Sequence, residues 1–273
     1  MLIHQSENSV GENSYKVTKY KNKSWYYHYH ANPELIYIHK GELIIRTPGK
    51  VENMQQGDFC LFLSGQPHSI ESVGETEFHI CIFADSFVKE FTKRIKGKVG
   101  EKSVFSLSKE KEEYIKNLIL MYPYPDILAI KSMLYGVCSE YMASTGFIDA
   151  EDKCIQMETE ILKFIDENFH RDVSLKDISE SLGYEYHYLS RRFNKGFNMN
   201  FKNFLNQFRY RKAKVMLLSG NRVMADVAKK SGFQSVRNFN KVFKELSGYG
   251  PREFLKSESV FFEGSDNIRR YYD

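Results

Sequence analysis

Two segments in the last hundred residues share one pattern of apolar and polar positions, residues 175–193 and 223–244. In each segment, a small residue lies four positions before a glycine, and two large apolar residues separated by four positions follow the glycine. These residues are Ser179, Gly183, Leu189 and Phe193 in the first segment, and Ala228, Gly232, Phe239 and Phe243 in the second. The spacing predicts a short helix, a glycine turn and a second helix with two buried anchors and an exposed polar face. We therefore expect two helix-turn-helix units.

A longer amphipathic pattern, residues 201–218, lies between the two units. Its apolar side is expected to carry Phe201, Phe204, Leu205, Phe208 and Val215, and its other sides Arg209, Arg211, Lys212 and Lys214. Ser219-Gly220 is a helix-terminating pair. The segment predicts a long helix that holds the two units at a fixed separation.

The N-terminal half shows a different pattern, because short apolar runs separated by glycines extend from Trp25 to Phe83. The runs 34–38 and 42–46 flank Gly41, which predicts a hairpin turn between two strands. Several strands at this spacing, without intervening helices, predict a small antiparallel barrel or a double-sheet jelly roll.

Two apolar helices are expected after the strands, over residues 108–122 and 127–142. Tyr114, Leu118 and Met121 form the apolar stripe of the first, and the second is apolar on most of its circumference. Helices of this kind must cover another surface, either the barrel or a second subunit. We favour the subunit contact, hence a homodimer, with burial inside one chain as the alternative.

Length and composition narrow the class of protein. The 273 residues are enough for two domains, each with its own core. No run approaches the roughly 18 apolar residues of a membrane span, and the first residues lack the apolar core of a signal peptide. The four cysteines lack paired spacing, which favours reduced thiols. We expect a cytoplasmic protein without membrane contact.

Charge is distributed unevenly along the chain. Residues 1–150 carry 17 Lys and Arg against 18 Asp and Glu, whereas residues 186–256 carry 16 Lys and Arg against only three acidic residues. An excess of this size that coincides with two helix-turn-helix patterns is typical of a surface that contacts nucleic acid phosphates. Double-stranded DNA is the expected partner.

At residues 155–255 the chain resembles the DNA-binding domain of the AraC/XylS transcriptional regulators. The resemblance is carried by a closing signature and a linker-helix signature. The closing signature consists of Gly232-Phe233, Phe239, Phe243-Lys244, Gly248, Pro251 and Phe254. The linker-helix signature consists of residues 209–218. Two positions depart from the family pattern: Asn198 replaces a glycine, and Glu185 replaces the usual Ser or Thr cap, so the first recognition helix is expected to begin less firmly.

The resemblance assigns roles to residues of both units. The positions that contact bases in the family fall on His187, Ser190, Arg191, Val236, Arg237, Asn238 and Lys241. The residues placed for phosphate contacts are Arg192, Lys195, Lys202, Arg222 and Lys244. Arginine pairs with guanine and asparagine with adenine, which suits these positions. Two rigidly joined units are expected to enter successive major grooves about 34 Å apart.

The N-terminal half resembles the cupin-like sensor domains of the same family. His28-Tyr-His30 with Glu34 is similar to the first cupin motif, and the stretch from Gly57 to His68 to the second. His28, His30, Glu34 and His68 thereby match the four ligands of metal-binding cupins. We favour a structural or effector-binding use of this quartet over a divalent metal, and we expect no required cofactor.

The predicted fold is a two-domain α+β chain. An N-terminal antiparallel β cupin (jelly-roll) barrel with effector-sensing function occupies 1–105, and a helical linker and possible dimerisation segment occupies 106–150. An all-α domain with two helix-turn-helix units follows at 151–257, and a C-terminal tail at 258–273.

Three functional hypotheses follow from this organisation. The first is an effector-responsive transcription regulator without enzyme activity, whose small-molecule ligand, for example a sugar stacked on barrel aromatics, changes DNA binding. The second is a metal-binding cupin, as metal sensor or metalloenzyme, joined to a DNA-binding domain. The third is an architectural DNA binder that responds to no ligand.

Overall fold

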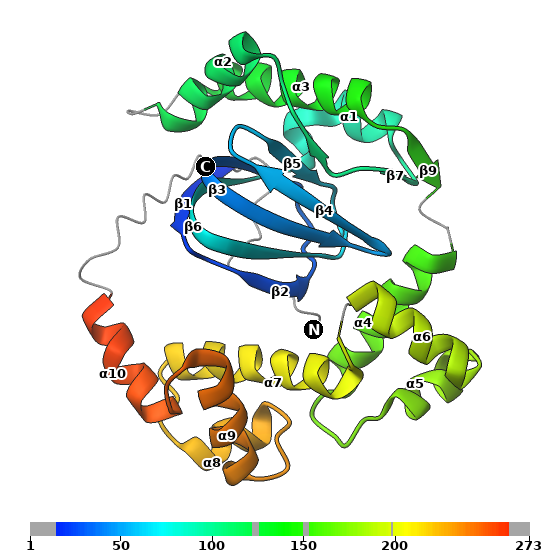
Figure 1. Ribbon diagram of the computed structural model, residues 1–273, viewed down its shortest axis with the longest axis vertical. Coiled ribbons are helices and arrows are strands. Elements are labelled where there is room, and N and C mark those ends of the chain that lie inside the picture. Colours follow the sequence, from blue (N-terminus) through cyan, green and yellow to red (C-terminus); the bar gives the residue numbers. More distant parts are fainter. Residues whose placement is uncertain (1–14, 122–125, 150–152, 198, 262–273) are drawn as a thin grey trace. The chain divides into compact units, whose positions relative to one another are not determined.

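The computed structural model describes residues 15–121, 126–149, 153–197 and 199–261, and these residues form two compact units (Figure 1). The division falls inside helix α4 (Lys153–Asn168), between Gln156 and Met157. Among the described helices, none combines the length and the apolar character that crossing a bilayer requires. Asn198 and residues 262–273 of the expected tail lie outside the described residues.

The N-terminal unit is built on one antiparallel sheet. Its strands run in the order β1-β6-β3-β5-β8, with β2 added on β6 and β4 on β3, and a separate pair joins β7 to β9. The strands are β1 (Tyr15–Lys21), β2 (Trp25–His28), β3 (Glu34–Thr47), β4 (Lys50–Gln55), β5 (Phe59–Phe62), β6 (His68–Phe83), β7 (Lys98–Gly100), β8 (Val104–Phe105) and β9 (Phe147–Asp149). The antiparallel cupin barrel expected from the sequence is confirmed.

The hairpin expected at Gly41 is wrong, because β3 passes through this position as one strand of 14 residues. It pairs with β6 on both sides of Gly41, and the register shifts twice between Ile38 and Glu42. Gly41 has φ +85° and lies so close to the backbone of Glu75 that a Cβ would collide with its carbonyl oxygen. The glycine therefore makes a bulge that bends the strand, a role that requires the same residue type as a turn.

Alternation along the strands separates two apolar faces of the sheet. The inner face carries Ile36, Ile38, Leu43, Ile45, Met54, Cys60, Phe62, Ile70, Phe78, Ile80 and Ile82. The outer face carries, among others, Leu35, Tyr37, Phe59, Leu61, Cys81 and Phe83. Both sets are almost completely buried, so the sheet is covered on both sides.

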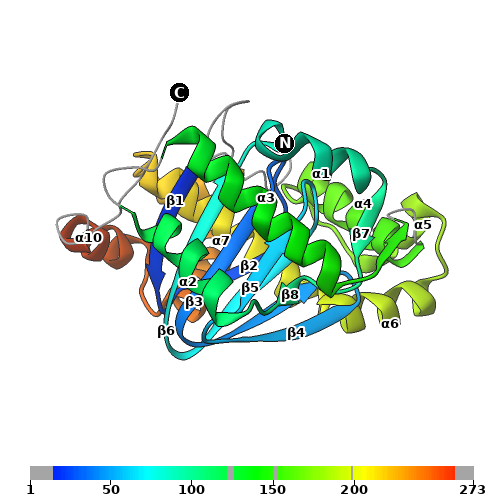
Figure 2. The same cartoon turned by 90° about the horizontal axis from the view of Figure 1, so that it is seen from above.

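Helices cover the outer face of the sheet (Figure 2). They are the 3-10 helix η2 (Asp85–Val88), α1 (Lys89–Arg94), α2 (Lys109–Leu120) and α3 (Ile127–Ser144). The apolar side of α3 packs into the same core as the sheet, through Met133, Leu134 and Val137. This burial within one chain was the alternative to the subunit contact that we had favoured from the sequence.

The apolar stripe of α2 agrees with the expectation only at Leu118. Ile115, Leu118 and Ile119 are buried, whereas Tyr114 and Met121 are 53% and 45% exposed. Both possible stripes contain apolar residues, and only the position of the sheet decides which of them is buried. Dimerisation through this segment stays a prediction.

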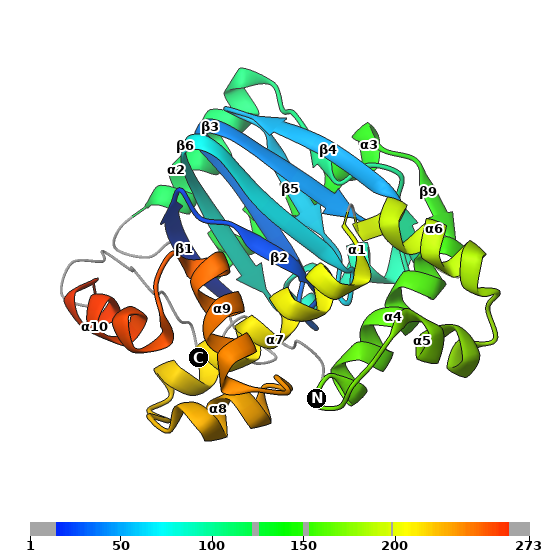
Figure 3. The same cartoon turned by 60° about the horizontal axis from the view of Figure 1, so that its bottom comes forward.

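The C-terminal unit is entirely helical in its described residues, and each of the two expected helix-turn-helix units is present (Figure 3). Its further helices are α5 (Leu175–Leu182), α6 (Tyr186–Phe197), α7 (Phe201–Leu218), α8 (Met224–Lys230), α9 (Val236–Ser247) and α10 (Pro251–Phe261). Gly183 and Gly232 both adopt positive φ, +72° and +88°, between the two helices of each unit. The four predicted anchors of α6 and α9 are fully buried.

Helix α7 connects the two helix-turn-helix units. Two of its residues differ in burial from the expectation. Val215, expected on the apolar side, is 57% exposed. Arg209, expected on a polar side, is buried and donates hydrogen bonds to the carbonyl oxygens of Phe169 (3.0 Å) and Arg171 (2.7 Å). The carbonyl groups at the end of α4 have no partner inside that helix, and the guanidinium supplies one.

The carbonyl group of Phe169 contacts two other parts of the C-terminal unit. It follows α4, it accepts the hydrogen bond from Arg209 of α7, and it lies against Gly232 in the turn of the second helix-turn-helix unit. A Cβ on Gly232 would collide with this oxygen, so only glycine fits. An ion pair at 3.0 Å joins the partly exposed Lys212 of α7 to the buried Asp166 of α4, and Lys212 Nζ also lies over the Phe169 ring.

We predict that replacing Gly232 by alanine destabilises the C-terminal unit more than the same change at Gly183. Both residues have positive φ, which costs alanine about 1–2 kcal/mol. Only Gly232 adds a collision with a backbone carbonyl, since nothing lies within 4 Å of a Cβ at Gly183. Thermal unfolding followed by helical circular dichroism measures the difference, and equal losses of stability in both variants contradict it.

Candidate functional site

The first candidate reading helix is α6, and its N-terminus is capped more firmly than the sequence predicted. One carboxylate oxygen of Glu185 accepts a hydrogen bond from the backbone N–H of His187 (2.8 Å) and the other from that of Tyr188 (2.7 Å). These bonds and the charges of His187 and Arg191 hold the pKa of Glu185 below its ordinary value, although desolvation opposes them. The weak start expected from the missing Ser or Thr is therefore wrong: Glu185 caps the helix by itself.

Helix α6 presents most of its expected DNA-contacting residues outward. His187 and Arg191 are exposed, and Ser190 is half-buried, above the buried anchors Leu189 and Phe193. The residues assigned to phosphates differ in exposure. Lys195 and, at the start of α7, Lys202 are exposed, whereas Arg192 is half-buried and its enclosed Nε–H has no acceptor among the described residues.

The second candidate reading helix, α9, has a conventional cap and a fully exposed reading face. The Ser235 hydroxyl accepts a hydrogen bond from the Asn238 N–H at 3.2 Å. The four residues expected to contact bases are exposed: Val236, Arg237, Asn238 and Lys241. Lys244 and, before α8, Arg222 are exposed as well. The structure therefore groups the expected base contacts of each unit on the first turns of one helix, where a recognition helix approaches base edges.

Two exposed aromatic residues of α6 were not selected from the sequence. Tyr186 and Tyr188 flank His187 and are exposed on the same helix. The helical period places Tyr188 off the Leu189–Phe193 face. Tyr186 lies three residues before Leu189 and seven before Phe193, on the side of the anchors, so its exposure could not be predicted from the period.

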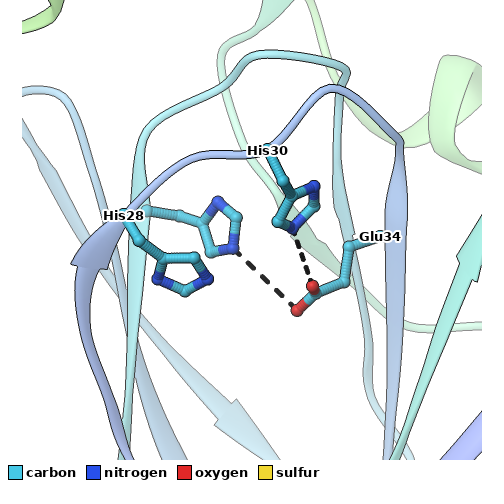
Figure 4. A group of neighbouring side chains, drawn as sticks. His28, His30 and Glu34 are labelled. Carbon is cyan, nitrogen blue, oxygen red and sulfur yellow. Dashed lines mark hydrogen bonds and ion pairs between the residues drawn. The ribbon is translucent and has the colours of Figure 1, made fainter. Parts of the chain in front are cut away.

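The second candidate site lies inside the cupin unit and contains the expected quartet (Figure 4). His28 ends β2, His30 lies in the following loop, and Glu34 and His68 begin β3 and β6. All four side chains are at most 1% exposed. One potential ligand atom from each residue lies within 4.8 Å of the others, so the four residues converge on one point.

The backbone fixes how the three imidazoles are oriented. Their Nδ1 atoms donate to the carbonyl oxygens of Tyr26, Asn32 and Gln66, at 2.6–2.8 Å. Carbonyl oxygens only accept, so Nδ1 carries a proton in each ring and Nε2 is left to face the quartet. Phe62 stacks on His68, with ring centroids 3.7 Å apart, and restricts that ring further.

Glu34 is the acidic partner of this group. One of its oxygens lies 2.8 Å from His30 Nε2, and the other lies 3.9 Å from His68 Nε2. Burial acts to raise the pKa of this carboxyl, but the hydrogen bond to His30 and the charges of His30, His68 and Lys16 outweigh burial and lower it. A buried carboxylate is stable here because the imidazoles compensate its charge.

The quartet fits a divalent metal by its donor chemistry. Three imidazole Nε2 atoms and one carboxylate are ligands that Mn, Fe, Ni or Zn accept. The Nδ1–carbonyl hydrogen bonds are the outer contacts that metal-bound histidines usually have. The same inward-facing polar atoms also fit a polar group of an organic ligand.

The rest of the inner face has a different character. Isoleucines and Phe78 continue the wall beyond the quartet. Tyr20 and Trp25 pack against each other, with ring centroids 4.7 Å apart, and against Phe78 at 5.9 and 6.0 Å. The inner face thus combines one polar, histidine-rich end with an apolar and aromatic wall.

Comparison with known proteins agrees with both halves of the chain. The model of a helix-turn-helix domain matches residues 171–257, and that of a cupin domain matches residues 20–83. An HTH-type transcriptional regulator of Staphylococcus aureus is 26% identical over 146 residues, which are 54% of this chain and 19% of that protein. The chain therefore spans about a fifth of the length of such relatives. The HTH-type regulator YisR of Bacillus subtilis is 22% identical and aligns over 82% of this chain and 85% of its own length.

Solved structures show the same fold. The structure of ToxT from Vibrio cholerae with a bound unsaturated fatty acid has a TM-score of 0.50 and 17% identity, covering 90% of this chain and 97% of ToxT. An apo form of a ToxT variant has a TM-score of 0.52 and covers 88% and 96%.

Both domain matches and the named relatives agree with the folds and motifs described above. The chain therefore carries an AraC-type helix-turn-helix domain and, in its N-terminal half, a cupin domain, the pair of domains expected from its resemblance to the AraC/XylS transcriptional regulators.

Proposed function

We propose that this chain is a cytoplasmic, effector-responsive regulator that binds specific DNA sequences as a homodimer. The observation that carries the proposal is the pair of capped, basic reading helices, α6 and α9, whose exposed faces hold the predicted base contacts. A ligand in the cupin unit changes how the two helix-turn-helix units bind DNA. The proposal assigns no catalytic step to either unit.

The DNA contacts divide into two classes. Arg237 is suited to guanine O6 and N7, Asn238 to adenine N6 and N7, and Val236 to a thymine methyl group. The lysines and arginines beside them, such as Lys244, are suited to phosphates, which position the protein without reading sequence. Because α7 joins the units through buried contacts, the two reading helices approach DNA as one body.

The inner face of the cupin unit supports an apolar or amphiphilic effector. Its wall is formed by aliphatic and aromatic side chains, which bind hydrocarbon better than the hydroxyl groups of a sugar. A single polar group of the ligand would face the quartet. The unsaturated fatty acid bound to ToxT, whose fold is similar, is a ligand of this class.

The proposal of a homodimer is supported by apolar side chains that are exposed on the cupin unit. At the adjoining ends of α2 and α3, Leu128 is 72% exposed, and Leu120, Met121 and Ile127 are each more than one third exposed. A patch of this composition favours a second copy. Sedimentation that finds a monomer at micromolar concentration, with and without DNA, excludes the dimer.

The DNA-reading proposal predicts different defects for two basic residues of α9. Binding sites are first selected from random duplexes with the unaltered full-length chain. Replacing Arg237 by alanine should cost about 1–3 kcal/mol and relax preference at one base pair. Replacing Lys244 by glutamine should weaken all sequences alike and lower the salt slope by about 1.

Titration of the selected site and of single-base variants, at several salt concentrations, separates the two defects. An Arg237→Ala variant with unchanged base preference contradicts the reading role of α9. Failure of the unaltered chain to select any sequence overturns the proposed function itself.

A second candidate function is favoured by the geometry of the quartet. We propose as the alternative that His28, His30, Glu34 and His68 hold a divalent metal, so that the unit senses metal or supports metal chemistry. Three rings with anchored Nδ1 atoms and converging Nε2 atoms support this alternative. A bound metal would supply a Lewis acid there.

Elemental mass spectrometry of tag-free protein distinguishes the two candidates. The metal alternative predicts near-stoichiometric metal, lost in His28→Ala/His68→Ala and kept in His39→Ala/His79→Ala. The control pair lies in the same unit, with its two rings in contact and outside the quartet. Unaltered protein that takes up no metal even after reloading contradicts the alternative and leaves the organic effector.

A further inference from the structure

The cupin unit carries a basic segment that the proposed function does not use. Residues 89–102 contain six cations and only two acids, Glu90 and Glu101. The cations are Lys89, Lys93, Arg94, Lys96, Lys98 and Lys102, and all six are exposed. None of them forms an ion pair with another residue in the described ranges.

This segment is an exception within its unit. Outside it, residues 1–150 carry 11 Lys and Arg against 16 Asp and Glu, an acidic balance. Many of those other cations are neutralised by nearby acids: Lys19 and Lys21 by Glu77, Lys40 by Glu75, Arg46 by Glu71, Lys111 by Glu140 and Lys116 by Glu113. The unpaired cations are therefore concentrated at one place, on a unit that would otherwise repel a polyanion.

The backbone beneath these cations is fixed. Phe91 and Ile95 of the segment are buried in the core under helices α1 and α3. The Tyr141 hydroxyl donates to the Lys102 carbonyl oxygen at 2.9 Å, and Lys50 Nζ donates to that of Gly100 at 3.4 Å. Because the backbone is held in this way, a partner has only the side chains of the segment to order on binding.

The position of the segment along the fold indicates a partner. Strand β7, which carries Lys98, pairs with β9, and Lys98 stands opposite Asp149 in the register. Strand β9 is the last element before α4, whose first residue is Lys153. The basic segment thus lies at the end of the cupin unit from which the chain continues into the helix-turn-helix domain. This position favours DNA bound by that domain as the partner.

We propose that residues 89–102 bind the phosphate backbone of DNA that flanks the site read by α6 and α9. The inference rests on the proposed DNA binding and adds a contact made by the other unit. Lysines and arginines on a fixed scaffold fit phosphates, and they read no bases there. Each phosphate they neutralise steepens the dependence of affinity on salt by about 0.9.

The test compares two full-length double variants that remove equal charge. Lys93→Gln/Lys96→Gln removes two cations of the segment. Lys23→Gln/Lys109→Gln removes two exposed cations of the same unit outside the segment, neither of which forms an ion pair among the described residues. Each protein is titrated with a short duplex that holds only the selected site and with a long duplex that adds flanking DNA on both sides.

On the long duplex, the unaltered chain is expected to bind more tightly and with a steeper salt slope than on the short one. The Lys93→Gln/Lys96→Gln variant should lose this gain, with a slope lower by about 1–2, and keep its affinity for the short duplex. The Lys23→Gln/Lys109→Gln variant should match the unaltered chain on both duplexes.

Other results overturn the inference. If the segment variant equals the unaltered chain on both duplexes, flanking DNA is not its partner. If it also fails to activate or repress transcription while it binds DNA normally, the segment serves an acidic protein surface instead. A separate outcome concerns the proposed function: it is contradicted if the unaltered chain does not bind the short duplex sequence-specifically.

Discussion

The DNA-binding unit depends on one backbone group, the carbonyl of Phe169. Its oxygen accepts a hydrogen bond from the buried Arg209 guanidinium of α7, and Gly232 of the second turn lies directly against it. An unpaired carbonyl in this position would cost about 1–3 kcal/mol, and a side chain at Gly232 would displace it. Through this contact the end of α4, the linker helix and the second helix-turn-helix unit become one body. The contact holds the second unit on α7, and α6 is held on the same helix by the packing of Phe193 against Phe204.

The cupin unit buries a carboxylate and three imidazoles, whose polar atoms need partners inside the protein. Backbone carbonyls hold the Nδ1 side of each ring, and Glu34 is compensated by the rings on the other side. Such a group is stable only when its charges are paired, which makes it sensitive to whatever metal or ligand group replaces that pairing. The surrounding aliphatic wall excludes water and strengthens these interactions.

Local patterns predicted most of the architecture, and long-range contacts decided the rest. Helical spacing and glycine positions were sufficient for both helix-turn-helix units, and the spacing of His28, His30, Glu34 and His68 was sufficient for the quartet. Gly41 was misread because a bulge and a hairpin both require positive φ, and only pairing with β6 distinguishes them. Arg209 was misread because its partners are carbonyls some 40 positions away in the chain. Glu185 was misread because Glu, unlike Asp, is not among the preferred capping residues, although its carboxylate accepts the same bonds.

The central claim is that the two reading helices act as one rigid body on two successive grooves. A half-turn insertion of about 5 bp between the two halves of a selected site tests it most directly, because it rotates one half to the opposite face of the duplex. The account predicts that specific affinity falls nearly to the level of unrelated DNA and that a full-turn insertion of about 10 bp does not restore it, since the separation set by α7 is fixed. Unchanged affinity after the half-turn insertion would contradict the claim.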